Sequence, residues 1–205
     1  MTAGAVVWLA GAYLLGAVPS SYLLARWMGG IDLRKVGSGN LGATNLYRQL
    51  GWKAAIPAGL FDVLKGTVPT LAAGRFAADP AWLPIAVGLA AVLGHVYSPF
   101  VRFKGGKGVA TAAGVFLALA PLSLSAAAVV WVGLLRGTGY MSVASMGGAT
   151  AFVIATALIY AGKPLVVGVA VLVCGFIVFT HRSNILRLLT GTEARFGGRG
   201  REGGR

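Results

Sequence analysis

Acidic residues, histidine and cysteine are scarce in this chain of 205 residues. It has five Asp and Glu residues in total, two histidines and a single cysteine. With Cys174 alone, neither a disulfide framework nor a cysteine-based metal site can form. The few carboxylates are scattered along the sequence, so no cluster suited to Mg²⁺ is present and no carboxylate stands out as a general base.

Apolar residues dominate the composition. Hydrophobic residues make up 57% and charged residues 11% of the chain, and the apolar runs reach the ~20 residues that cross a bilayer core. The sequence therefore predicts an integral membrane protein. The net charge is +13, and the basic residues flank these runs. Such flanks indicate membrane orientation and contact with anionic lipid, so we expect no nucleic acid partner.

Six apolar runs are candidate spans, and the fourth is ambiguous. They cover residues 3–28, 54–73, 81–100, 109–135, 141–160 and 164–180. As a helix the fourth run would extend ~40 Å, too long for one upright span and too short for two full ones. A reversal near Pro121 puts the basic tail on the same side as the other basic loops. The sequence therefore predicts an all-α polytopic fold with seven transmembrane segments, two of them short.

The distribution of cations predicts the topology. Fifteen of the 18 Lys and Arg residues fall on one face, with Arg75 and Lys163 opposite and Lys65 inside a span. No basic residue precedes the first span and Arg26 follows it, so we expect an uncleaved anchor with the N-terminus outside and the C-terminus cytoplasmic. Residues 1–195 are predicted to form one membrane domain, and residues 196–205 a disordered Arg/Gly-rich tail.

Three polar stretches on the predicted inner face carry candidate chemistry. Residues 38–48 (SGNLGATNLYR) join hydroxyl and amide groups to a guanidinium, which suits a phosphate, although a capped loop explains them equally well. Residues 103–111 (FKGGKGVAT) place three glycines around Lys107 before an apolar run, as in an anion-binding nest; a plain glycine-rich turn is the alternative. Val101 and Gly108 stand where a Walker A loop needs Gly and Ser or Thr, so a nucleotide hydrolase is disfavoured.

The third stretch, residues 181–195, follows the last span. His181 and Asn184 fall on one face of a helix, where an imidazole and an amide could act on one ligand, although an interfacial helix with a basic tail is equally compatible. Other polar residues outside the proposed site also need an explanation. We expect Asp62 to pair with Lys65, with a place lining the cavity as the alternative, and Glu193 to pair with Arg187 or Arg195. His95 could support the site or be a satisfied buried histidine.

These three stretches resemble, nearly position for position, the signature motifs of the bacterial acyl-phosphate:glycerol-3-phosphate acyltransferase family (PlsY). Flanking stretches, including residues 16–37, 61–66 and 94–95, also resemble the family, so the similarity spans most of the chain. The sequence Tyr97-Ser98-Pro99 departs from a common Phe-Pro pattern, and the tail from Phe196 is individual.

The resemblance implies a seven-helix inner-membrane enzyme that needs no cofactor or metal. It transfers a fatty acyl group from acyl phosphate to the 1-hydroxyl of glycerol 3-phosphate, and the products are lysophosphatidic acid and inorganic phosphate. The expected partners are these two substrates and membrane lipid; a monomer is the simplest expectation. The expected catalytic residues are Ser38, Lys107, His181 and Asn184, and the expected substrate-binding residues are these four with Asn40, Thr44, Asn45, Arg48, Lys104, Gly105, Gly106 and Gly108.

Two other functions remain open at this point. A membrane carrier for an organic phosphate also uses broken helices and basic cavities, but residues 1–100 and 101–205 show no internal repeat. A scaffold that binds anionic lipid would explain the basic tail but not the glycine-lysine loop. The proton acceptor, either His181 or a substrate phosphate, is also left open.

Overall fold

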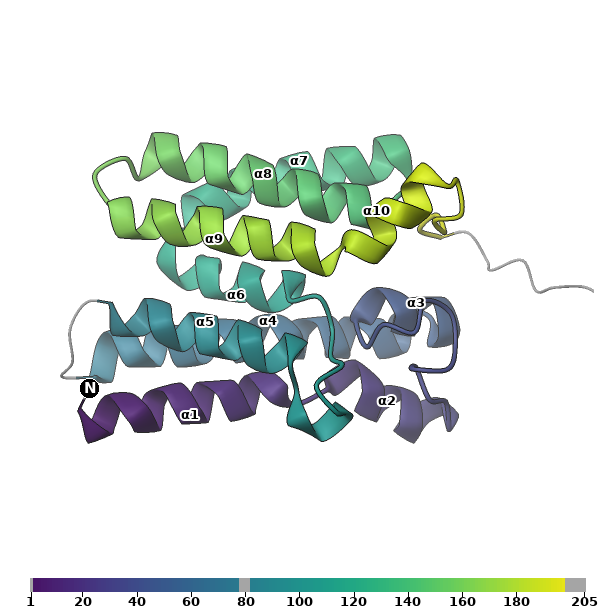
Figure 1. Cartoon of the computed structure of the whole chain (residues 1–205), viewed down its shortest axis with the longest axis horizontal. Helices are drawn as coiled ribbons and strands as arrows, with labels where there is room; N and C mark the ends of the chain where they lie inside the picture. Colours follow the sequence, from purple (N-terminus) through teal and green to yellow (C-terminus); the bar gives the residue numbers. More distant parts are fainter. Residues whose placement is uncertain (1, 78–81, 198–205) are drawn as a thin grey trace, which may run out of the picture. The chain divides into compact units, whose positions relative to one another are not determined.

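The computed structural model describes residues 2–77 and 82–197, and these residues are helical with no strand (Figure 1). The chain divides into two compact units, Met1–Leu119 and Ala120–Arg205. The all-α, multi-pass class expected from the sequence is confirmed. The single domain over residues 1–195 stays a prediction, and the tail prediction falls mainly on residues 198–205, outside the described residues.

The described residues of the first unit, 2–77 and 82–119, form six α-helices and one 3₁₀ turn. They are α1 (Ala3–Ala17), α2 (Ser20–Gly29), α3 (Ala43–Leu50), α4 (Trp52–Phe76), α5 (Leu83–Val96), η1 (Pro99–Val101) and α6 (Val109–Leu119). Helix α4 packs against α5 and α6, and α1 packs against α5. The predicted first span is broken at Val18 and Pro19, because proline supplies no N–H for continuing the helix.

In the second unit, residues 120–197 as described form four helices, α7 (Pro121–Thr138), α8 (Met141–Ile159), α9 (Pro164–Thr180) and α10 (Arg182–Leu189). Helix α8 packs against both α7 and α9. Prolines at the first helical positions of α7 and α9 fit the helix start, where a missing N–H costs nothing. Gly139 ends α7 in a left-handed conformation, with φ 75°.

The predicted span count is approximate. By length and apolar composition, four described helices can cross a membrane, or five if the bent pair α9 and α10 forms one span. Helix α4 has 25 residues but carries buried charges, and α6 is apolar but has 11 residues; these two bring the total to seven. The break predicted near Pro121 is confirmed at Ala120, but only α6 is short, because α7 has 18 residues.

Helices α4 and α6 approach each other closely through two glycines. A Cβ added to Gly66 would overlap the carbonyl oxygen of Thr111, and one added to Gly114 would overlap that of Val63. The Thr67 hydroxyl donates to the Gly114 carbonyl over 2.9 Å. Small residues at helix contacts are typical of membrane proteins. Lipid tails are as apolar as the side chains, so helices associate through close van der Waals packing instead of the hydrophobic effect.

Candidate active site

The loop before α3 is organised by the buried side chain of Asn45. Its amide Nδ2 donates to three loop carbonyls, those of Leu33, Val36 and Asn40, over 3.1–3.3 Å. Its Oδ1 accepts the N–H of Ser38 over 3.2 Å. Asn45 therefore holds the loop in shape, and its direct contact with a substrate stays a prediction.

Two glycines flank Ser38 in this loop. Gly37 and Gly39 have φ values of 57° and 69°, in the left-handed region that glycine tolerates. A Cβ on Gly37 would also overlap Asn45 Oδ1, so the position requires glycine. Between them, Ser38 is exposed. Residue 38 is thus accessible to a ligand.

Helix α3 carries the other candidate residues of the first stretch. Thr44 and Arg48 are four residues apart, so they lie on one side of the helix, and both are half-buried. An ion pair between Asp32 and Arg34 lies at the start of the loop, with Asp32 Oδ2 2.7 Å from Arg34 Nη2. The Arg34 hydrogen bonds lower the pKa of Asp32 to about 2, so this ion pair is intact at neutral pH.

The glycine-lysine loop lies against the end of α5. The Gly105 N–H donates to the Val96 carbonyl over 2.9 Å, and the Gly106 N–H donates to the His95 carbonyl over 3.1 Å. The predicted anion nest therefore does not extend to these two N–H groups. A Cβ on Gly106 would overlap the His95 ring, so the two glycines allow close packing instead.

Lys107 and Gly108 immediately precede α6. Lys107 is half-buried and Lys104 is exposed. Gly108 has φ 84°, which turns the chain into the helix at Val109. An ammonium group beside the N-terminal end of a helix suits a phosphate, because both supply positive charge.

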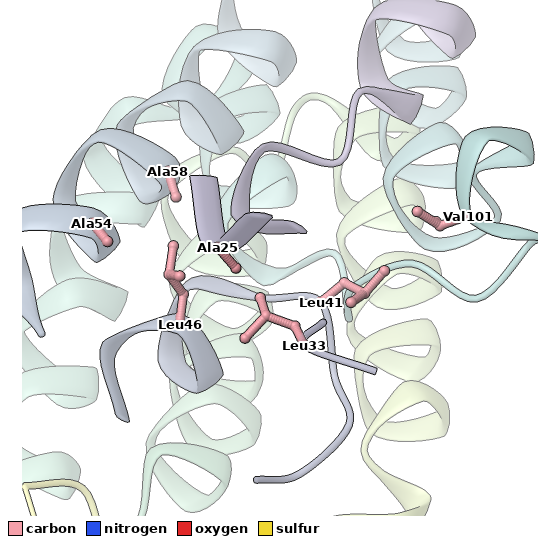
Figure 2. Packing of buried hydrophobic residues seen from close by; sticks show 7 residues of the cluster. All are labelled: Ala25, Leu33, Leu41, Leu46, Ala54, Ala58 and Val101. Atoms are coloured by element: carbon pink, nitrogen blue, oxygen red, sulfur yellow. The ribbon is translucent and has the colours of Figure 1, made fainter. Parts of the chain in front are cut away.

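The first two motifs lie in the same unit and share a hydrophobic cluster. The cluster joins Leu41 and Leu46 of the first stretch to Val101, just before the glycine-lysine loop (Figure 2). Its other members are Ala25, Leu33, Ala54 and Ala58. The two polar stretches are therefore anchored to one hydrophobic cluster through Leu41, Leu46 and Val101.

His181 of the third motif lies at the bend between α9 and α10, which is 55°. It is buried, and its Nδ1 lies 2.8 Å from the Ile177 carbonyl. A carbonyl can only accept, so Nδ1 carries the hydrogen and Nε2 is the basic nitrogen of the neutral ring. His181 can therefore act as a proton acceptor through Nε2.

Asn184 is oriented by Glu193. Its Nδ2 donates to Oε1 over 2.6 Å, and Ser142 of α8 donates to the same oxygen over 2.8 Å. Arg187 Nε lies 2.7 Å from Oε2, which confirms the expected Glu193–Arg187 pair. Burial raises the pKa of Glu193, but the bonds from Asn184, Arg187 and Ser142 outweigh it and leave the pKa below its ordinary value.

Sequence reasoning did not anticipate the contact of Ser142 with this carboxylate. Ser142 is 51 residues from Glu193 and belongs to an apolar span without a motif of its own. Within the described ranges, no three His, Cys, Asp or Glu side chains gather in a way that could hold a metal ion.

The three motifs are thus distributed over both units. Those around Ser38 and Lys107 belong to the first, and the one around His181 and Asn184 belongs to the second. Their convergence on one pocket stays a prediction.

Known proteins match this chain over nearly its whole length. The family model described as glycerol-3-phosphate acyltransferase matches residues 6–191. A glycerol-3-phosphate acyltransferase of Geotalea daltonii is 48% identical over 191 residues, covering 93% of this chain and 97% of that protein. One of Thermus thermophilus is 47% identical over 198 residues, covering 95% and 97%.

Two solved structures are similar to the whole chain. The glycerol 3-phosphate form of PlsY (YgiH), an integral membrane glycerol 3-phosphate acyltransferase, is 42% identical with a TM-score of 0.88, covering 95% of this chain and 96% of that one. The lysophosphatidic acid form is 40% identical, with a TM-score of 0.85 and the same coverage. The chain therefore belongs to the glycerol-3-phosphate acyltransferase family.

Proposed function

We propose that this membrane acyltransferase moves a fatty acyl group from acyl phosphate to the 1-hydroxyl of glycerol 3-phosphate. The observation that carries the proposal is the pairing, in one unit, of the Ser38 loop with the glycine-lysine loop before α6. Both substrates carry a phosphate, and both loops present cations and hydroxyl or amide donors. The acyl chain of the donor requires a site that opens to lipid.

Lys107 and the N-terminal end of α6 bind the phosphate of the acyl donor. Acyl phosphate is a mixed anhydride whose phosphate leaves readily, so positioning and charge stabilisation account for most of the acceleration. As the acyl C–O(P) bond breaks, negative charge grows on the departing phosphate, and the Lys107 ammonium stabilises it. A covalent enzyme intermediate is unnecessary.

Ser38, Arg48 and Lys104 bind the phosphate of glycerol 3-phosphate. A guanidinium offers two parallel donors to phosphate oxygens, which fixes orientation as well as affinity. Asn40 in the loop and Thr44 in α3 add polar contacts, while Asn45 keeps the loop in shape. The acceptor hydroxyl is thereby held next to the acyl carbonyl.

His181 and Asn184 position the attacking hydroxyl. The hydroxyl oxygen forms the new ester bond to the acyl carbon while its proton leaves, either to His181 Nε2 or to a phosphate oxygen of a substrate. Glu193 supports this arrangement because it fixes the amide of Asn184. The products are lysophosphatidic acid and inorganic phosphate.

The active site faces the cytoplasm from a bacterial inner membrane, with the N-terminus outside and the C-terminus cytoplasmic. Fifteen of the 18 basic residues lie in connections on one side if the chain crosses seven times, and cytoplasmic loops carry such an excess. This topology puts His181 and Lys107 on the same side of the membrane.

Phosphate release tests the reaction directly. Purified protein is incubated with palmitoyl phosphate and glycerol 3-phosphate, without coenzyme A or acyl carrier protein, and both phosphate and lysophosphatidic acid are measured. The proposal expects equimolar products. No release, together with uptake of glycerol 3-phosphate into proteoliposomes, would instead identify a carrier.

Accessibility labelling tests the topology. In a Cys174→Ala background, single cysteines replace the exposed residues Arg102 and Arg182, which neighbour the two motifs, and Lys163 on the opposite side. A membrane-impermeant maleimide applied to sealed, right-side-out vesicles should label only Lys163→Cys. Labelling of Arg102→Cys and Arg182→Cys from opposite sides would exclude a shared pocket.

A further inference from the structure

A buried polar cluster outside the three motifs contacts the glycine-lysine loop. Asp62 and Lys65 of α4, His95 of α5 and Ser20 of α2 are each at least nine-tenths buried in the membrane-spanning part of the first unit. Charged groups at such positions are costly, so they are expected to have a function or a structural reason. None of the four binds a substrate or accepts a proton in the proposed reaction.

The Asp62 carboxylate contacts the other three side chains of the cluster. Its Oδ1 lies 2.7 Å from Lys65 Nζ and accepts the Ser20 hydroxyl over 2.8 Å. Lys65 Nζ also donates to the Val18 carbonyl over 3.0 Å, at the break between α1 and α2. The Asp62–Lys65 pair expected from the sequence is confirmed, and its position is fixed by two neighbouring helices.

The His95 ring lies between this carboxylate and the loop. Its Nδ1 is 3.6 Å from Asp62 Oδ1, so the ring directs its polar edge at the negative charge. Its opposite edge faces the α-carbon of Gly106, where an added Cβ would come within 2.8 Å of Cε1 and overlap Nε2. The imidazole is therefore a spacer between α4 and the loop.

The backbone of His95 supports the same loop. Its carbonyl oxygen accepts the Gly106 N–H over 3.1 Å, and it also lies where a Cβ of Gly105 would be. Both the ring and the carbonyl of one residue thus define the path of the two glycines that precede Lys107. The backbone of Gly105 and Gly106 must move if His95 shifts toward it, because His95 already fills the space beside both glycines.

We infer that Asp62 and His95 are positioning residues for Lys107: the buried carboxylate orients the His95 ring, and the ring sets the path of the loop that presents the lysine. This rests on the proposed function for the role of Lys107 in binding the acyl phosphate. The loop geometry itself does not depend on it. The ligand chiefly affected is the phosphate of the acyl donor, which Lys107 binds; glycerol 3-phosphate is affected less, through Lys104 of the same loop.

Three variants separate this role from simple structural support. His95→Phe keeps the ring volume against Gly106 but removes the nitrogen that faces Asp62. His95→Asn keeps a side-chain donor near the position of Nδ1. Asp62→Asn combined with Lys65→Met removes the carboxylate charge without leaving a buried cation unpaired. Tyr13→Phe is the matched control, because it removes a hydrogen bond to Tyr97 at the same end of α5 without touching the loop.

Hydrogen exchange of residues 104–108 is measured in the purified proteins without substrate. We expect about tenfold faster exchange in His95→Phe and in the Asp62→Asn/Lys65→Met variant, partial recovery in His95→Asn, and no change in Tyr13→Phe. In the transfer assay the KM for palmitoyl phosphate should rise about tenfold, with a smaller change in the KM for glycerol 3-phosphate.

Unchanged exchange of the loop in a folded His95→Phe protein would overturn the inference. A fall in melting temperature together with an equal rise in the KM for both substrates would also overturn it, since a purely structural role predicts that result. If the double variant does not fold, the two His95 variants decide the question. Because exchange is measured without substrate, it tests the inference even if the wild-type protein fails to transfer an acyl group.

Discussion

The amide nitrogen of Asn184 lies 2.6 Å from Oε1 of Glu193, a carboxylate nine residues later in the chain. The same carboxylate accepts Ser142 from α8 and Arg187 from α10. One of the few acidic residues of the protein thus ties the third motif to the neighbouring span. The consequences for activity and stability can be measured.

Glu193→Ala should lower both activity and stability. Each hydrogen bond to a charged group contributes roughly 1.5–3 kcal/mol, and the donors of Asn184 and Arg187 would lose their partner, so we expect a loss of about 2–4 kcal/mol of unfolding free energy. Thermal unfolding in detergent and kcat measure the two effects. Arg195→Ala is the control, because Arg195 stacks on Tyr140 instead of contacting Glu193; an equal loss there would refute the assignment.

The pKa of Glu193 predicts a specific acid sensitivity. Because its folded-state pKa is below the ordinary value of 4.5, Glu193 adds stability that is full above pH 4.5 and is lost as the pH falls through the lowered pKa. The difference in melting temperature between wild type and Glu193→Gln should therefore shrink below pH 4.5. A constant difference down to pH 3 would contradict the prediction.

Lys107→Ala should reduce transfer by at least about 10²-fold, since it removes the cation that stabilises the leaving phosphate. The fold should survive, because Lys107 is half-buried on a loop. Phosphate release is measured on protein of verified monodispersity. Lys163→Ala, which changes a lysine on the predicted opposite face, should retain wild-type activity, and retained activity in Lys107→Ala would remove this residue from the site.

His181→Ala distinguishes the two proton acceptors. If Nε2 accepts the proton, kcat should fall by about 10²–10⁴-fold, the usual contribution of a general base. Near-normal turnover would instead identify a substrate phosphate oxygen as the acceptor. The pH dependence of kcat in wild type and variant provides the second measurement, since removal of a side chain that accepts the proton should change the pH profile.

Asn45→Ala should weaken binding of glycerol 3-phosphate without changing the acyl-phosphate site. It leaves three loop carbonyls and the Ser38 N–H without their bonds, at a cost of about 2–4 kcal/mol to the loop conformation. The KM for glycerol 3-phosphate should rise more than that for palmitoyl phosphate. Gln49→Ala, on the same helix, is the control; a selective effect on palmitoyl phosphate would contradict the prediction.

The residues that fix the class and the candidate chemistry could be found from the sequence. The length of the apolar runs is enough to predict that they cross a membrane. Proline predicts the helix break near Pro121, because it lacks an N–H. Local pairs such as Asp62–Lys65 were predictable because three residues span less than one helical turn. The signature stretches gave the candidate residues, since residue type largely determines which groups can bind phosphate.

Contacts between distant segments were decided only by the tertiary structure. Nothing in the spacing of Gly106 and His95 shows that the Gly106 N–H donates to the His95 carbonyl, and Ser142 lies in an apolar span far from Glu193. The sequence determined what kinds of groups are available and which solvent surrounds them, because those depend on composition and local periodicity. Packing decided which N–H groups bond to carbonyls and which carboxylate orients which amide, because these depend on how close the helices come.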